Sequence, residues 1–466
     1  MEQSIKDLAV KYDFVWDRLS ENERAAVMEM GEDYKRFIDA GKTERLCTRE
    51  IVRCAREQGF ADLNDVDSLR PGDKVYSVNR GKGVVLAVIG SDEVAQGVSI
   101  VGSHIDSPRL DIKQNPLYEE GGMALFKTHY YGGVRKYQWV ARPLALCGVV
   151  VRRDGSVLDI CIGDGPEDPV FYISDLLPHL AADQNKKTLA DGVAGEDLNA
   201  VAGTIPVGER EDKHRFKLAV LKLLHDKYGM TEEDFVSAEL ELVPAGNARD
   251  VGFDRASIAA YGHDDRVCAY TSMRALFDIT SCKKTAVALF VDKEEVGSNG
   301  STGMHSRNFA NVLGRMIELQ RGACSGFDVD RALARSALLS SDVAAAFDPN
   351  YPSVADVRNT AYLGKGVTLV KYTGSRGKSG SNDASAEFLG EVRKCLNDAG
   401  VVWQTSELGK VDQGGGGTIA YILANCDMDV VDIGVPVLSM HAPFEVVSKA
   451  DVYMTVRAYL AFYHSR

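Results

Sequence analysis

Five short apolar segments of the chain are each followed at once by histidine or carboxylate residues. The five clusters are His104 and Asp106 after VSIVGS, Asp264 and Asp265 in YGHDDR, Glu294 and Glu295 after TAVALFVDK, Asp342 after ALLSS, and His441 after VPVLSM. Short apolar runs of this kind predict buried strands. In open α/β sheets, ligand sites form outside the carboxyl ends of the strands, so side chains far apart in the sequence can converge. The pattern therefore predicts a sheet with a functional site along one edge.

The segments between these clusters predict a mixture of helices and strands. The first sixty residues have the apolar spacing of helices, and Ser20 with Glu23 forms a capping-box pattern. KGVVLAVIG and GVSIVGSH predict strands. After about residue 252, strand-like and helical stretches alternate, which is typical of a mostly parallel α/β sheet.

The region 110–250 has a different character and predicts an inserted domain. A strand-like stretch there turns at Asp154-Gly155, which indicates a hairpin, and HRFKLAVLKLLHDKYG predicts one helix. We therefore expect residues 1–109 and 251–466 to form one α/β domain, with a β-rich second domain at 110–250.

Composition excludes several classes of protein. The chain has 466 residues, 45% of them hydrophobic, which is ordinary for a globular protein of two or three structural units. The nine cysteines are scattered and form no Cys-x-x-Cys motif, which favours a reducing, cytoplasmic location. The formal charge of −13 disfavours a nucleic-acid partner. No segment approaches the roughly 20 apolar residues of a membrane helix, and the N-terminus lacks the apolar core of a signal peptide.

The residue types in the five clusters suit divalent metal ions. Histidine nitrogens and carboxylate oxygens bind Zn²⁺, Mn²⁺ or Co²⁺, and two metals about 3.5–4 Å apart require a bridging ligand. One aspartate could bridge, leaving one histidine and one carboxylate for each metal. Neighbouring side chains in extended backbone point in opposite directions, so one of Glu294 and Glu295 could bind metal while the other acts as general base. Asp106, two residues after His104, could hold the second ring nitrogen of that histidine.

Each cluster alone also has an ordinary structural interpretation. A single histidine or a Glu-Glu pair is commonly a solvated surface feature, and Asp342 alone would be a helix N-cap more often than a ligand. Five such clusters after five apolar runs make coincidence the weaker explanation.

With these residues identified, the chain resembles the M18 family of metallo-aminopeptidases, the aspartyl aminopeptidase group. The resemblance is carried by GSHIDSPRLDIK (102–113), YYGGVRKYQWVARPLALCG (130–148), LLPHLA (176–181), HDDR (263–266), DKEEVGS (292–298), SSDVAAAFDPNY (340–351), GGTIAYILA (416–424) and DIGVPVLSMHAPFEV (432–446). It implies a mostly parallel-sheet α/β zinc-peptidase catalytic domain with an inserted β-rich dimerisation domain.

The resemblance also implies roles for particular residues. One metal would be held by His104, Asp264 and Asp342. The second would be held by Asp264, Glu295 and His441, so that Asp264 bridges the two. Glu294 would be the general base, and Asp106 would support His104.

The family further implies an assembly, a dodecamer built from dimers. In that assembly a histidine of the inserted domain stabilises the oxyanion in a neighbouring subunit's site, and His179 occupies the matching segment. Near the expected substrate pocket, Gly377-Lys378-Ser379-Gly380 and Gly415-Gly416 differ from the usual family sequences. Lys371 and Lys378 could still pair with an acidic substrate side chain, or they could be solvated loop lysines.

The function predicted from these residues is a two-metal aminopeptidase that removes the N-terminal residue of peptides, with a possible preference for Asp or Glu. A related metal-dependent deacylase of N-acyl amino acids would use the same metal ligands. A self-assembling shell or cargo protein without catalysis is the third hypothesis, although it would not need the complete set of ligands.

Overall fold

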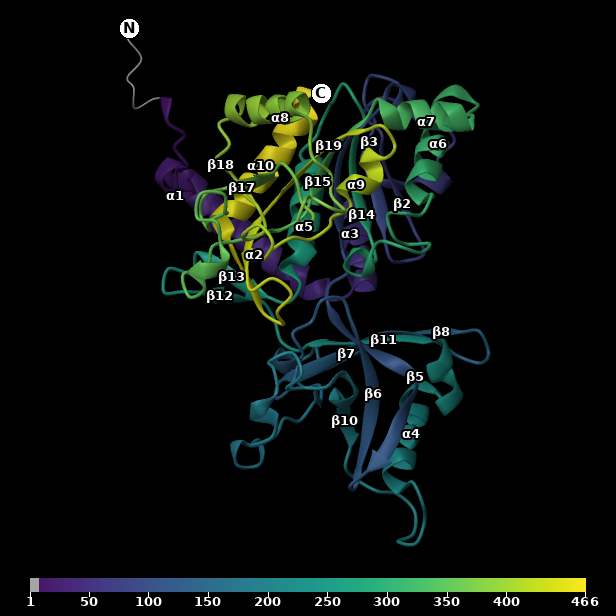
Figure 1. Ribbon diagram of the computed structural model, residues 1–466. Coiled ribbons are helices and arrows are strands. Elements are labelled where there is room, and N and C mark those ends of the chain that lie inside the picture. Colours follow the sequence, from purple (N-terminus) through teal and green to yellow (C-terminus); the bar gives the residue numbers. More distant parts are fainter. Residues whose placement is uncertain (1–7) are drawn as a thin grey trace. The chain divides into compact units, whose positions relative to one another are not determined.

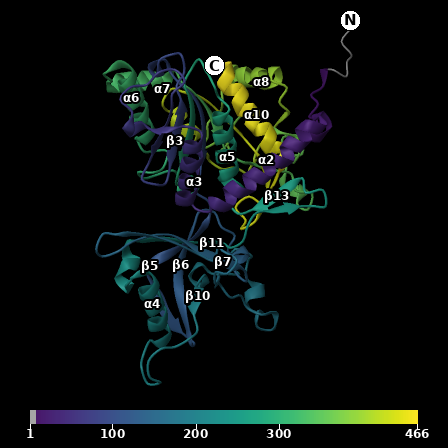
Figure 2. The same cartoon turned by 180° about the vertical axis from the view of Figure 1, so that it is seen from behind.

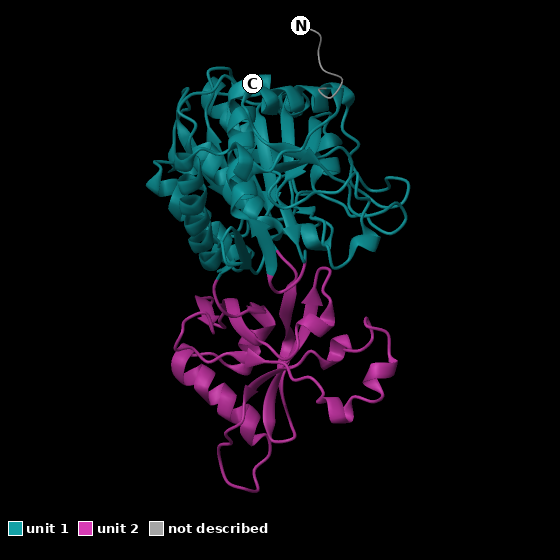
Figure 3. Cartoon of the chain, turned by 90° about the vertical axis from the view of Figure 1, so that its left-hand side faces the viewer, with its two compact units in different colours: residues 1–106, 248–440, 445–466 teal, residues 107–247, 441–444 magenta. Residues whose placement is uncertain are grey.

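The computed structural model describes residues 8–466 and divides into two compact units. Unit 1 comprises the described residues up to Asp106, together with Ala248–Met440 and Glu445–Arg466 (Figure 3). Unit 2 comprises Ser107–Asn247 and the short segment His441–Phe444. The predicted domain 1–109 begins at residue 1, and its first seven residues lie outside the described part of the chain.

Unit 1 is built on a nine-stranded sheet with the order β1-β2-β3-β14-β4-β15-β19-β17-β18. Figure 1 labels most of these strands, among them β14, β15 and β19. Its strands are β1 (Ala61–Asp62), β2 (Lys74–Val78), β3 (Val84–Val88), β4 (Ser99–His104), β14 (Ala286–Val291), β15 (Ala337–Ser341), β17 (Val367–Val370), β18 (Trp403–Thr405) and β19 (Asp429–Gly434). The four central strands β14, β4, β15 and β19 are mutually parallel. Antiparallel pairs join β3 and β17 to this centre. The predicted α/β class and the mostly parallel sheet are confirmed.

Helices cover both faces of this sheet. The helices of unit 1 are α1 (Val15–Arg18), α2 (Glu21–Ala40), α3 (Glu44–Glu57), α5 (His263–Phe277), α6 (Asn308–Arg321), α7 (Gly326–Ala334), α8 (Ala386–Asp398), α9 (Ala420–Ala424) and α10 (Lys449–Ser465). Side chains of α2, α3, α5, α8 and α10 form one apolar cluster with the sheet, and those of α6, α7 and α9 form another. Figure 2 shows α2, α5 and α10 gathered on one side and α6 with α7 apart from them. Neighbouring residues of β3 alternate between the two clusters, as a strand buried on both faces must.

Local sequence signals explain where several elements begin and end. Ser20 and Glu23 form the predicted capping box of α2, with the Glu23 N–H donating to Ser20 Oγ and the Ser20 N–H donating to the Glu23 carboxylate. This arrangement satisfies two backbone donors that a helix start leaves open.

Within residues 8–466, no helix is both long enough and apolar enough to span a membrane.

A second sheet in unit 1 was not anticipated as a separate sheet. Its order is β12-β13-β21-β20-β16, comprising β12 (Arg249–Val251), β13 (Ser257–Ala260), β16 (Ala344–Ala345), β20 (Pro436–Leu438) and β21 (Glu445–Ser448). The continuous apolar run VVDIGVPVLSM (430–440) predicts one strand, but the structure divides it between β19 and β20. This prediction is wrong because the run carries no signal for a change of sheet.

Unit 2 contains a seven-stranded antiparallel sheet with the order β11-β5-β6-β10-β9-β7-β8. Its strands are β5 (Arg109–Glu120), β6 (Met123–Tyr131), β7 (Pro143–Val151), β8 (Val157–Ile162), β9 (Phe171–Tyr172), β10 (Ala200–Gly203) and β11 (Ala238–Pro244). The hairpin between β7 and β8 turns at Asp154-Gly155, and α4 (Arg215–Tyr228) is the helix expected there, so both local predictions are confirmed.

Candidate metal centre

The register of the central strands brings three of the sequence clusters to one edge of unit 1, and contacts with His104 add the Asp264–Asp265 cluster at the start of α5. His104 is the last residue of β4, and it pairs with Val291, the last residue of β14. Asp342 follows directly on β15, whose Ser340 pairs with Gly102 of β4. Because these strands are parallel, the side chains that follow them lie beyond the same edge. The predicted convergence therefore follows from the strand order.

The approach of β19 to Asp342 requires a glycine. A Cβ atom built on Gly434 would lie 1.8 Å from the main-chain oxygen of Asp342. Asp342 also donates its N–H to the Ile433 oxygen at 3.2 Å. The backbone that carries Asp342 is therefore held in place by close contact with β19.

His104 is the centre of the cluster. It is 2% exposed, and its Nε2 lies 3.1 Å from Asp264 Oδ1. Its Nδ1 lies 3.2 Å from Asp106 Oδ1 and 3.0 Å from the main-chain oxygen of Asp106. A ring nitrogen held by a carboxylate and a carbonyl fixes the orientation of the imidazole, which leaves Nε2 facing the other carboxylates.

Asp106 also holds the turn that carries the two glutamates. Its Oδ1 accepts the N–H of Glu294 at 3.1 Å, and its Oδ2 accepts the N–H of Glu295 at 3.3 Å. Glu294–Val296 form a 3₁₀ turn between Lys293 (φ 70°) and Gly297 (φ 91°). The expectation of extended backbone here was wrong, because two consecutive N–H groups turn toward one buried carboxylate. The Glu294 Oε2 lies 3.9 Å from His104 Nε2.

The aspartates 264 and 265 lie at the start of α5, directly after β13. The Asp264 N–H donates to Glu445 Oε2 at 3.0 Å, and the His104 N–H donates to Asp265 Oδ2 at 3.3 Å. Glu445 is 1% exposed and belongs to β21. We did not identify Glu445 from the sequence, since its partner is 181 residues away and no local motif marks it.

Two groups of three side chains could each hold a metal ion. Within each group, the three ligand atoms lie within 4.8 Å of one another. One is His104, Asp264 and Glu295, and the other is His104, Asp265 and Asp342. Nitrogen and carboxylate donors at this spacing fit a divalent cation such as Zn²⁺. The second group contains Asp265 beside His104 and Asp342. The family resemblance implied Asp264 in that position.

His441 belongs to neither group among the described residues, and its segment clusters with unit 2. Within that unit its Nδ1 lies 3.1 Å from the Gly133 oxygen. A Cβ atom on Gly133 would approach the same nitrogen to 2.9 Å, so a larger residue there would displace the His441 ring. This contact orients the imidazole ring of His441.

The electrostatics of the cluster favour bound positive charge. Burial lowers the pKa of His104, but its bonds to Asp106 and Asp264 and the nearby Glu294 outweigh burial and raise that pKa well above its usual value. Burial and neighbouring carboxylates raise the pKa of both Asp265 and Asp342 well above the usual range. Crowded carboxylates in a buried site are stabilised by cations. By contrast, burial lowers the pKa of His263 to about 3, and this ring is held by Tyr34 and the Ile258 oxygen.

The remaining predicted residues lie elsewhere in their units. His179 is exposed in a 3₁₀ turn of unit 2, Pro178–Leu180, beside the exposed Leu177 and Leu180. In unit 1, Lys371 and Lys378 both bind the Asp383 carboxylate, at 2.9 and 2.8 Å. The two lysines are therefore neutralised in part by a residue of the chain itself.

A histidine and several carboxylates at the carboxyl edge of an α/β sheet, with a glutamate beside them, define a metal-dependent hydrolase. The model of the family described as "Aminopeptidase I zinc metalloprotease (M18)" matches residues 37–463. The chain belongs to this M18 family and is an aminopeptidase of the zinc metalloprotease type.

Individual relatives agree with this assignment. A probable M18 family aminopeptidase 1 of Clostridium acetobutylicum is 51% identical over 98% of this chain and 99% of its own length. The crystal structure of an M18 family aminopeptidase from Thermotoga maritima has a TM-score of 0.94 and 46% identity, covering 98% of this chain and 100% of that one. The dodecamer structure of a Saccharomyces cerevisiae aminopeptidase shares the fold, with a TM-score of 0.74 and 19% identity over 93% of this chain and 96% of its own.

Proposed function

We propose that this aminopeptidase works with two divalent metal ions, which are Zn²⁺ in the main proposal, with Mn²⁺ or Co²⁺ as the alternatives. His104, Asp264 and Asp342 would hold one ion, and Asp264, Glu295 and His441 would hold the other. The observation that carries the proposal is the pair of ligand groups that share His104. Asp265, which stands in the second group, would complete or position that side of the centre.

The bound ions would polarise the scissile carbonyl and bring the pKa of water toward neutrality. Glu294 would be the residue that moves the proton. Its carboxylate lies 3.9 Å from His104 Nε2, whereas the Asp264 carboxylate lies 3.1 Å from the same nitrogen. Glu294 is therefore next to the ligand cluster. Glu294 would take a proton from the attacking water and deliver it to the nitrogen of the leaving peptide. Two hydrogen bonds from its turn to Asp106 keep the carboxylate at that edge.

The supporting residues have distinct tasks in this proposal. Asp106 holds both His104 and the glutamate turn, so one carboxylate couples a ligand to the base. Glu445 accepts the N–H of Asp264 and so fixes the start of α5. These are positioning residues, because they act through the groups that would touch metal or substrate.

The substrates would be peptides with a free N-terminal amine, which would bind beside Glu295. A preference for an acidic first residue is the finer proposal. It is supported by Lys371 and Lys378, which together with Asp383 carry a net charge of +1. An acidic substrate side chain would have to share these lysines with Asp383, so the preference would be moderate.

The proposed assembly is a homo-oligomer, a dodecamer built from dimers, with unit 2 as the dimerisation domain and unit 1 as the catalytic domain. The dodecamer described for the yeast relative supports this proposal at the level of the fold. In the assembly, the exposed His179 would reach a neighbouring subunit and assist the developing oxyanion.

We also propose that the protein is cytoplasmic. Its cysteines form no disulfide within the described residues, which is typical of a reducing compartment.

The test is a release assay on matched substrates after the protein has been stripped of metal and reloaded with Zn²⁺, Mn²⁺ or Co²⁺. Each aminoacyl-naphthylamide is used with a free and with an acetylated amine. We expect metal-dependent release from free amines only. Release from acetylated substrates alone would identify a deacylase instead, and no release from the assembled particle would favour a structural role. The Asp and Glu substrates, compared with Leu and Ala, test the acidic preference separately.

A further inference from the structure

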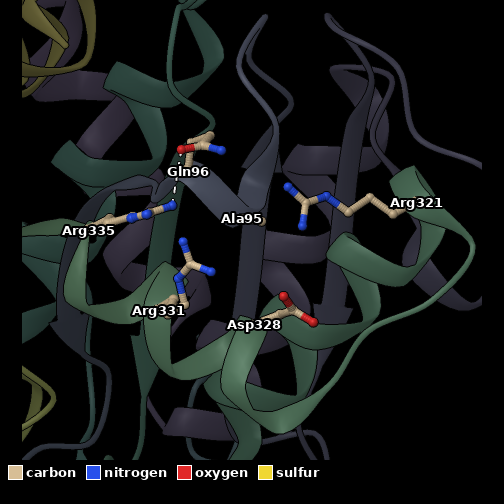
Figure 4. A pocket seen from close by; sticks show the side chains of 6 residues that line it. All are labelled: Ala95, Gln96, Arg321, Asp328, Arg331 and Arg335. Atoms are coloured by element: carbon tan, nitrogen blue, oxygen red, sulfur yellow. Dashed lines mark hydrogen bonds between the residues drawn. The ribbon is translucent and has the colours of Figure 1, made fainter.

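Three arginines surround a small pocket on unit 1 that has no part in the proposed reaction. Its lining residues are Ala95, Gln96, Arg321, Asp328, Arg331 and Arg335 (Figure 4). Figure 4 shows the three guanidinium groups pointing into the space between the Gln96 segment and α7. Arg335 donates to Gln96 Oε1 at 3.1 Å, which holds one of the three in place.

The pocket lies at the opposite edge of the sheet from the candidate metal centre. Gln96 precedes β4 by three residues, and Arg335 precedes β15 by two, whereas His104 is the last residue of β4 and Asp342 directly follows β15. The six residues of β4 at about 3.3 Å each separate the two edges by roughly 17–20 Å. A ligand bound here would not touch the metal ligands.

The charge of the pocket is opposite to that of the chain. The lining carries three positive groups and one carboxylate, a local balance of +2, in a protein with a formal charge of −13. Glu93 binds the guanidinium of Arg321, whose Nε lies 3.0 Å from its Oε2. Within residues 8–466, Arg331 makes no ion pair within 4 Å, and its guanidinium lies 5.6 Å from the centre of the Phe327 ring. Hydrogen bonds from Ser325 lower the pKa of Asp328, and the charges of Arg321 and Arg331 lower it further. The lining therefore sets this one carboxylate against three guanidinium groups, which leaves an excess of positive charge for an anion.

Part of this arrangement has a structural explanation. Arg321 and Arg331 lie in the last turns of α6 and α7, where positive side chains stabilise the helix dipole. That explanation accounts for each arginine on its own helix. It does not require three guanidiniums from two helices and the following turn to face one space, because their mutual repulsion opposes this.

We propose that this pocket binds the phosphate group of a small ligand. Guanidinium groups donate paired N–H bonds to oxyanions, and a phosphate offers more acceptor oxygens and more charge than a carboxylate. The cavity volume is about 60 Å³, while one bound water requires only about 10–15 Å³. A phosphate therefore fits. The exposed Phe327 ring beside Arg331 could also contact the organic part of a phosphomonoester.

The experiment is calorimetric titration of the assembled, metal-loaded protein with inorganic phosphate and, separately, with adenosine 5′-monophosphate, at low chloride concentration. The variants are Arg331→Gln and Arg335→Gln. Arg331 is exposed, and its interactions are with the Phe327 ring and the charge of Asp328, so Arg331→Gln should fold normally. The matched control is Arg315→Gln, which removes an exposed arginine of α6 that pairs with Glu318 at 2.8 Å outside the pocket.

We expect one phosphate group bound per subunit, at least about tenfold weaker binding in each pocket variant, and unchanged binding in the control. Tighter binding of the nucleotide, lost in Phe327→Leu, would identify an organic phosphate as the ligand. Equal binding of both, unaffected by Phe327→Leu, would identify inorganic phosphate. Phosphate can also bind the divalent metal ions of the loaded protein. Weaker binding in the pocket variants distinguishes binding at the arginines from binding at the metal. No binding at millimolar phosphate, or equal binding in Arg331→Gln and Arg315→Gln, would overturn the proposal.

Discussion

Replacing Asp106 with asparagine tests whether one carboxylate supports both the histidine ligand and the glutamate turn. In the structure, Asp106 Oδ1 faces His104 Nδ1 and the Glu294 N–H, and Oδ2 accepts the Glu295 N–H at a position with no solvent exposure. Asparagine keeps one acceptor oxygen and replaces the other with an NH₂ group. One buried backbone N–H would then face a donor.

The magnitude follows from these contacts. An unsatisfied buried donor costs about 1–3 kcal/mol, and losing the charge weakens the other two bonds, so we expect a total loss of roughly 2–4 kcal/mol. Part of this would be seen in the free energy of unfolding by urea. The rest would be seen as a decrease of about 10–100-fold in metal affinity and in kcat/KM, the range found for residues that support metal ligands.

The assay combines a chelator competition for metal affinity, steady-state kinetics and urea unfolding. The matched control is Asp92→Asn. Asp92 is a partly exposed carboxylate of the same unit that precedes β4, whereas Asp106 follows β4. The control should leave all three measurements unchanged. If Asp106→Asn matched the control in metal affinity and kcat/KM, the coupling of ligand and base through Asp106 would be refuted.

Three further substitutions test other parts of the account. Gly434→Ala should lower stability by about 1–3 kcal/mol or more and weaken metal binding, because its Cβ would lie 1.8 Å from the Asp342 oxygen. Asp250→Asn should lower stability at neutral pH by roughly 2 kcal/mol. Burial raises the pKa of Asp250, but bonds led by the one from Lys449 lower it to about 2, so this contribution should vanish as the pH falls from about 4 to 2. Glu294→Gln should lower kcat by about 10²–10⁴-fold with metal content retained.

Each of these variants has a control in the same chain. Gly390→Ala in α8 has open space around it and should stabilise the helix slightly without changing metal affinity. Asp226→Asn breaks an exposed pair with Lys222 and should change stability little at any pH. Glu318→Gln should leave kcat unchanged. Stable Gly434→Ala protein with normal metal affinity, a pH-independent effect of Asp250→Asn, or an active Glu294→Gln enzyme would each contradict the corresponding argument.

The parts of the fold predicted from the sequence are those fixed by local patterns. The capping box of α2 depends on two residues three positions apart, and the β7–β8 hairpin depends on two adjacent residues; both features are present. The strands that carry His104 and Asp342 were predicted because buried parallel strands are continuous apolar runs. The separation of β19 from β20 was missed, since alternation of side chains does not reveal which sheet a strand joins.

The candidate site divides in the same way. Residues that end or follow a strand, such as His104 and Glu294, could be selected from the sequence, because placement at a strand end is a local property. The turn geometry of Glu294–Val296 could not, because it depends on the distant Asp106 carboxylate. Glu445 has an ordinary position within a strand, and only the folded chain brings it to the N–H of Asp264.

The number of metal ions required per active subunit tests the central claim most directly. Metal-free protein would be titrated with Zn²⁺ while bound metal, by elemental analysis, and release from a free-amine substrate are followed on the same samples. The account predicts that activity rises to its plateau only as the second equivalent per subunit binds. Full activity at one equivalent, with no further gain at two, would contradict a two-metal mechanism.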